Sequence, residues 1–163
     1  MTFMKYLFLG AALGLFQGSL EMAWSLGGPA PDLLLVYVIW LGMRRQTTEA
    51  MLVAFVGGLV VDGVAYYEPM GIRSLLKVTV AYLPEWAHYI LLPENRLTGW
   101  LLVGGGTTLQ QVLLLTIIQT LRAGEVWGIQ AVWDTGLLIA WNLVCWMILT
   151  AVFSPVTDHG TPI

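Results

Sequence analysis

Charged side chains are scarce in this sequence. Only 10% of the 163 residues are Asp, Glu, Lys or Arg, against about a quarter in an ordinary soluble domain, and 58% are hydrophobic. A soluble fold of this size needs more polar surface than these side chains can supply. Lipid accepts Leu and Val as neighbours, so the composition excludes a soluble domain and predicts a single membrane domain.

Basic runs and paired cysteines are also missing. The net charge is −3, and no cluster of Lys and Arg exists that could neutralise a phosphate backbone, which argues against a nucleic-acid partner. The single cysteine, Cys145, lies in an apolar stretch and can form no intrachain disulfide. A lone buried thiol usually serves only as packing.

Catalytic and metal-binding motifs are absent as well. His88 and His159 are far apart, and no cluster has metal-ligand spacing. Residues 104–106 are three glycines without a following lysine, so they form no phosphate-binding loop. We therefore expect no metal, no cofactor and no enzyme activity. The one enzymatic alternative is an acid–base pair of Glu85 and His88.

What the sequence does contain is a series of hydrophobic segments separated by short polar breaks. A helix that spans the bilayer needs roughly 20 apolar residues. The fold class predicted is all-α, a polytopic bundle of about six transmembrane helices within a single domain over residues 1–153, with a short, disordered polar tail over 154–163. The expected helices are 4–24, 32–43, 49–65, 71–89, 97–121 and 131–153.

The second segment is too short to span the bilayer. Pro31 and Asp32 suit a helix start, where a missing N–H is harmless and a carboxylate faces the positive end of the helix dipole. Arg44 and Arg45 follow only twelve residues later. Either the helix continues past them and they reach the headgroups, or the segment is tucked among its neighbours.

Lysine and arginine placement predicts the orientation. The first apolar run resembles a signal peptide, but it contains Gln17 and Glu21, so we expect it to be retained as a helix with its start in the cytoplasm. Both termini are then cytoplasmic. The basic residues on the cytoplasmic side are Lys5, Arg44, Arg45 and Arg96, and those toward the outside are Arg73, Lys77 and Arg122.

Three glycines recur at four-residue spacing on the first helix: Gly10, Gly14 and Gly18. Such a stripe lets another helix approach closely. Two alternatives are open, namely packing within the chain and docking of a partner's transmembrane helix.

Ionisable and polar groups within apolar segments need partners. Asp62 ends the third helix, and Arg73 and Lys77 share one face of the fourth, so a structural ion pair between Asp62 and one of them is expected. The remaining polar groups should bond to other helices or line a cavity for a vitamin-sized ligand. They are Gln17, Glu21, Gln110, Gln111, Gln119 and Asn142.

The central part of the chain resembles the rod shape-determining protein MreD family. The residues that match its pattern are Pro31-Asp32-Leu33-Leu34-Leu35, Arg44-Arg45, Gly57-Gly58-Leu59-Val60-Val61-Asp62 and Pro69-Met70-Gly71-Ile72-Arg73-Ser74-Leu75. Asp62, Pro69, Gly71 and Arg73 are thus motif positions. The loop after the fourth helix departs from the family, in which it is often basic.

The resemblance implies a non-catalytic inner-membrane subunit of the bacterial cell-wall elongation complex. Its implied partners are the lipid bilayer, MreC, RodA and a penicillin-binding protein, with MreB filaments in the cytoplasm. The family is also similar in fold to substrate-binding subunits of energy-coupling-factor transporters. A membrane subunit that binds a vitamin for transport is therefore the alternative function.

Overall fold

The computed structural model describes residues 2–24, 28–65, 70–90, 96–121 and 128–153. Within these ranges it is all-helical, and each segment expected from the sequence forms one helix. The helices are α1 (Thr2–Ala23), α2 (Leu33–Met43), α3 (Thr47–Ala65), α4 (Ile72–Ile90), α5 (Arg96–Leu121) and α6 (Ile129–Val152). The tail 154–163 lies outside the described residues, so the domain boundary at residue 153 stays a prediction.

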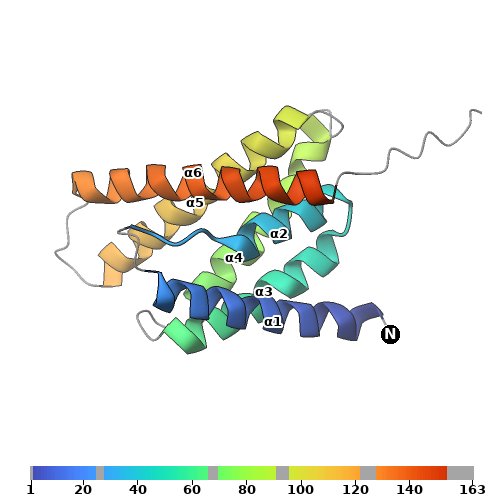
Figure 1. Cartoon of the computed structure of the whole chain (residues 1–163), viewed down its shortest axis with the longest axis horizontal. Helices are drawn as coiled ribbons and strands as arrows, with labels where there is room; N and C mark the ends of the chain where they lie inside the picture. The colour runs from blue at the N-terminus through green and yellow to red at the C-terminus, as the bar shows by residue number, and fades with distance from the viewer. Residues whose placement is uncertain (1, 25–27, 66–69, 91–95, 122–127, 154–163) are drawn as a thin grey trace, which may run out of the picture.

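The helices form a bundle around α2. Pairs packed along one another are α1 with α3, α3 with α4, and α5 with α6, while α2 contacts all five other helices. Figure 1 shows α2 beginning midway along the length of α1 and α6 and ending at the end of the bundle where α1 starts. The residues before it, Gly28 to Asp32, are not helical. This stretch of chain therefore crosses the bundle partly as irregular backbone and partly as helix.

The central position of α2 explains its composition. Leu34, Val38 and Ile39 are fully buried, and the eleven residues of the helix carry no charge. The helix ends at Met43, so the tucked arrangement is confirmed and continuation past the arginines is wrong.

Only four of the six helices are long and apolar enough to cross a membrane on their own, namely α1, α3, α5 and α6. The expectation of about six transmembrane helices is therefore confirmed in part: six helices form, and within the described residues four of them have the length and hydropathy of a membrane span. Helix α2 is too short, and α4 includes Arg73, Lys77, Glu85 and His88. Helix α2 is enclosed by the other five helices, whereas α4 packs against α2, α3 and α5 and leaves Leu75, Tyr82 and Trp86 exposed.

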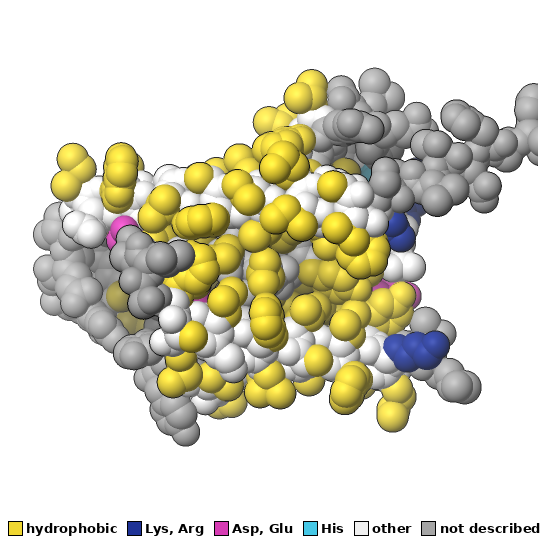
Figure 2. Space-filling view, in the orientation of Figure 1, with side chains coloured by type: hydrophobic (Ala, Val, Ile, Leu, Met, Phe, Trp, Pro, Cys, Tyr) yellow, Lys and Arg dark blue, Asp and Glu magenta, His cyan; other side chains and the backbone are white. Residues whose placement is uncertain are grey.

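The outer surface of the bundle is apolar. Phe8 on α1 and Trp133 on α6 are about three-quarters exposed, and hydrophobic side chains spread over the face of α1 and α6 in Figure 2, with charged side chains mainly near its two ends. In water such a surface would be a large unpartnered patch. In a bilayer it is the surface that lipid covers, which agrees with a helical membrane protein.

Candidate functional site

Buried polar side chains from five helices or their boundaries converge where α2 begins. We call this cluster the polar centre, and its members are Gln17, Asp32, Lys77, Thr107, Gln110 and Asn142. Each of these residues is at most 7% exposed. The site is therefore at the place where the irregular segment turns into helix.

Asp32 is at the middle of the polar centre. Its Oδ1 accepts the backbone N–H of Leu35 at 3.0 Å, which makes it the N-cap of α2. Its Oδ2 accepts a hydrogen bond from Lys77 Nζ, in a salt bridge, and a second one from Gln110 Nε2 at 3.0 Å. The carboxylate thus links α2 to α4 and α5.

Asn142 extends the network to α6. Its Oδ1 accepts the backbone N–H of Asp32 at 2.7 Å, and its Nδ2 donates to Thr107 Oγ1 at 3.0 Å. The Thr107 hydroxyl donates to the carbonyl of Val103, one turn earlier on α5, at 2.7 Å. Asn142 therefore joins α5 and α6 to the backbone that precedes α2.

Gln17 on α1 completes the support of this backbone. Its Nε2 donates to the carbonyl of Pro31 at 3.0 Å, and its Oε1 accepts the N–H of Leu33 at 3.0 Å. Unpaired backbone groups are not tolerated in the hydrocarbon region. Gln17, Asn142 and Asp32 itself provide the bonds that a helix would otherwise provide.

The electrostatics of the polar centre are those of a neutral pair. Lys77 and Asp32 are 2% and 6% exposed, and an isolated charge at such a depth would cost several kcal/mol. Pairing removes the net charge, and the hydrogen bonds from Gln110 and Leu35 occupy further lone pairs of the carboxylate. Removing either partner of such a pair costs about 3–5 kcal/mol, so the geometry favours a structural role for the site.

A second charged cluster joins the end of α1 to the start of α4. Arg73 Nη1 donates to Glu21 Oε2 at 2.5 Å, and Asp62 Oδ2 accepts the N–H of Gly71 at 2.8 Å. Gly71 has φ +99°, a conformation that favours glycine. The acidic residue of the glycine-rich run thus fixes the start of α4.

The structure excludes one of the two expected partners of Asp62. Lys77 belongs to Asp32 rather than to Asp62, and Arg73 contacts Glu21. Pairing of Asp62 with Arg73 stays a prediction, and Pro69 lies outside the described residues.

The glycine stripe of α1 packs against α3 of the same chain. A Cβ at Gly14 would lie 2.5 Å from the carbonyl oxygen of Gly57, one at Gly10 would lie 3.1 Å from the Val53 backbone, and one at Gly18 would lie 2.9 Å from the Val64 side chain. The first of the two alternatives, packing within the chain, is therefore what the structure has. A partner helix on this face would have to displace α3.

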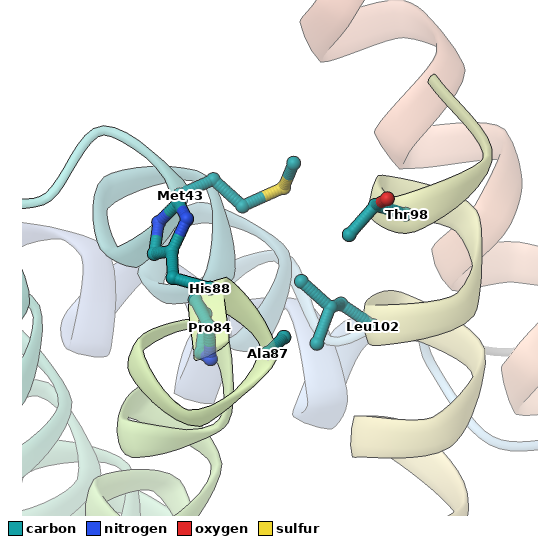
Figure 3. A pocket seen from close by; sticks show the side chains of 6 residues that line it. All are labelled: Met43, Pro84, Ala87, His88, Thr98 and Leu102. Atoms are coloured by element: carbon teal, nitrogen blue, oxygen red, sulfur yellow. The ribbon is translucent and has the colours of Figure 1, made fainter. Parts of the chain in front are cut away.

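Glu85 and His88 do not form the acid–base pair considered above. Glu85 Oε2 accepts the hydroxyl of Thr47. The His88 ring faces a small hollow that also has Met43 and Thr98 in its lining (Figure 3), and neither of its nitrogens has a hydrogen-bond partner among the described residues. Within the described ranges, no group of three or more His, Cys, Asp or Glu side chains is placed to hold a metal ion.

The expectation for the buried amides is confirmed in part. Gln17, Gln110 and Asn142 bond to other helices or to the backbone before α2. Reasoning from the sequence missed the role of Asp32 as a counter-ion, because it treated this residue only as a helix cap. The available signal was Lys77 itself, a cation inside an apolar helix that requires an acidic partner on another segment.

Comparison with known proteins agrees with this architecture. No curated protein and no solved structure matches the chain. The expected similarity in fold to transporter subunits is therefore not supported by a solved structure. A family model described as rod shape-determining protein MreD matches residues 1–156. That match spans all six helices, so it includes the polar centre and the second charged cluster, and the chain belongs to the MreD family of rod shape-determining membrane proteins.

Proposed function

We propose that this protein is a non-catalytic inner-membrane subunit of the bacterial cell-wall elongation complex, which binds transmembrane helices of partners such as MreC. RodA, a penicillin-binding protein and the MreB filaments are further partners in this proposal. The observation that carries it is the match to the family over nearly the whole chain. The described polar groups support it because they hold this chain's own helices together.

Recognition of a partner then takes place largely within the bilayer. Lipid provides no hydrophobic drive for helix association, so close packing of small residues has to provide affinity. Helix α5 has an outward face suited to this. A Cβ at Gly104 or Gly105 would meet no atom within 4 Å, and the hydroxyl of Thr108 is already bonded to the Gly104 carbonyl at 2.8 Å.

Substitution of Gly105 by leucine tests this proposal. Gly105→Leu adds a side chain where the described structure leaves open space, so the protein should fold and keep its thermal stability in detergent. Co-purification with MreC in mild detergent should fall at least ten-fold, because leucine prevents close approach of a second helix.

Gly14→Leu is the matched comparison. It places a side chain against the Gly57 backbone, so it should lower the stability of the protein itself together with all complex formation. Retention of MreC by folded Gly105→Leu would exclude the α5 face. Similar variants can be made with a bulky side chain on each of the other outward helix faces. If all of these variants fold and still retain MreC, recognition within the bilayer is contradicted.

The alternative of a vitamin-binding transporter subunit makes a different prediction. Gln17 and Asn142, which would line its ligand cavity, use both of their polar atoms for bonds to neighbouring segments. Gln110 uses its Nε2 for a bond to Asp32. Mass spectrometry of the purified protein should detect elongation proteins and no stoichiometric small molecule. A stoichiometric vitamin-sized ligand would favour the transporter alternative.

A further inference from the structure

The end of α2 has a backbone conformation that does not suit its residue. The N–H of Gln46 bonds to the Leu41 carbonyl at 3.2 Å, and the N–H of Arg45 bonds to the Gly42 carbonyl at 3.0 Å. These two bonds form a Schellman motif, in which the residue after the C-cap is left-handed and is usually glycine. Here that residue is Arg45, with φ +61°. Among the residues that the structure describes, it is the one non-glycine residue with a positive φ.

The fold does not require arginine at this position. The two backbone bonds satisfy carbonyls at the end of α2 without any side chain, and glycine adopts a left-handed conformation without steric cost. Within the described ranges, neither Arg44 nor Arg45 has a carboxylate oxygen within 4.0 Å. Both side chains are exposed. An arginine that is kept in this strained conformation, with no carboxylate partner among the described residues, indicates a role outside the chain.

The neighbour of Arg45 is held in a defined direction. The guanidinium carbon of Arg44 lies 3.8 Å from the centre of the Trp40 ring, and Trp40 contacts Phe153 at the end of α6, with ring centroids 5.7 Å apart. Stacking on an aromatic ring leaves the N–H groups of a guanidinium free at its edge. Aromatic side chains at helix ends are typical of the headgroup depth of a bilayer.

We propose that Arg44 and Arg45 bind the phosphate of one anionic phospholipid headgroup in the leaflet at this end of the bundle. Arginines on two consecutive exposed residues offer forked sets of N–H donors that match phosphate oxygens. The lipid is favoured over a soluble phosphate because both arginines follow a helix that is surrounded by lipid-facing helices, and because the aromatic pair of Trp40 and Phe153 beside Arg44 is typical of the headgroup depth.

The test is lipid retention by the full-length protein. The protein is reconstituted into nanodiscs of phosphatidylcholine that contain phosphatidylglycerol. After the protein is released from the nanodiscs, the lipid molecules that stay bound to it are counted by native mass spectrometry. Arg44→Lys combined with Arg45→Lys keeps both charges but removes the forks. We expect the retained phosphatidylglycerol to fall about five-fold or more, because attraction of a cation to the surface remains while bidentate binding is lost.

Two further variants separate the explanations. Arg45→Gly should raise or maintain the melting temperature, since it relieves the left-handed strain, and should lower lipid retention about five-fold. Lys5→Gln, which removes an exposed charge at the same end of the bundle (Figure 1), should leave retention unchanged.

Three results would overturn the proposal: unchanged retention in the double lysine variant, an equal loss in Lys5→Gln, or displacement of the lipid by millimolar inorganic phosphate. The first two would mean diffuse attraction by net charge. The third would mean a general phosphate site rather than a site for a membrane lipid.

Discussion

At the scale of single residues, the protein has few charged side chains in its interior, and those in the described residues bond to specific groups on other helices or to the backbone at helix starts. Asp32 caps α2 and neutralises Lys77, while Glu21 neutralises Arg73. Buried ion pairs are weak contributors to stability when compared with an apolar pair of similar volume. Their value here lies in specifying which helix ends meet.

Substitution of the central pair should show this dependence. Asp32→Asn leaves a good N-cap residue but an unpaired Lys77, so the free energy of unfolding in detergent should fall by about 3–5 kcal/mol. Adding Lys77→Met should restore part of the loss, because no charge then remains in the centre. Thermal or denaturant unfolding of the single and double variants measures this, and additive losses would mean that the two residues do not act as a pair.

At the scale of helices, glycine decides how closely α3 approaches its neighbours. Gly57 faces α1, and Gly58 faces α4, where a Cβ would lie 2.5 Å from the Cα of Ser74. Ser74 itself donates its hydroxyl to the Phe55 carbonyl at 2.8 Å. Adjacent glycines therefore allow one helix to be packed tightly on two sides.

Alanine scanning along α3 should separate this role from helix propensity. Gly58→Ala inserts a methyl group against the backbone of α4 and should cost about 1–3 kcal/mol of stability. Gly63→Ala on the same helix meets no atom within 4 Å and should be neutral or stabilising by up to about 1 kcal/mol. Unfolding of both variants in the same detergent provides the comparison; similar effects at the two positions would contradict the packing argument.

At the scale of the whole molecule, the path of the chain determines which helix ends lie together at one end of the bundle. Figure 1 shows the start of α1, the end of α2 and the end of α6 at the same end of the bundle. Lys5, Arg44 and Arg45 lie in the segments that meet there. The positive-inside rule predicts that this end is the cytoplasmic one.

Cysteine labelling tests that orientation. In a Cys145→Ala background, cysteines at Lys5 and Thr48 should react with an impermeant maleimide in inverted vesicles only. A cysteine at Gln130, at the start of α6, should react in intact spheroplasts. The opposite pattern would reverse the orientation, and labelling of Lys5→Cys and Thr48→Cys from different sides would show that the segment 24–43 does not cross.

The positions of the helices could be predicted from the sequence, but the contacts between them could not. Hydropathy and turn residues predicted a fifth helix over 97–121, and α5 runs from Arg96 to Leu121, because a membrane helix is a local feature of composition and length. The partner of Lys77 could not be predicted in this way. Asp32 and Asp62 are both acidic residues at the boundary of an apolar helix, and only the packing of α2 between α4 and α5 brings Asp32 to the lysine.

The same limit applies to the glycines. Spacing identifies Gly10, Gly14 and Gly18 as a smooth face, but it cannot show which helix covers that face. The order of the helices around α2 decides this, and it places α3 there.

The irregular backbone before α2 has a consequence for the order of events during synthesis. Its N–H at Asp32 is bonded by Asn142, and its carboxylate by Gln110, yet the ribosome makes both of these residues long after it has made residue 32. Until α5 and α6 emerge, this segment has its bonds to Gln17 and Lys77 but lacks those to Gln110 and Asn142. A segment that is synthesised early thus completes its hydrogen bonds only after α6 has been made, and a chain that stops short of residue 142 leaves the N–H of Asp32 without this partner in the lipid.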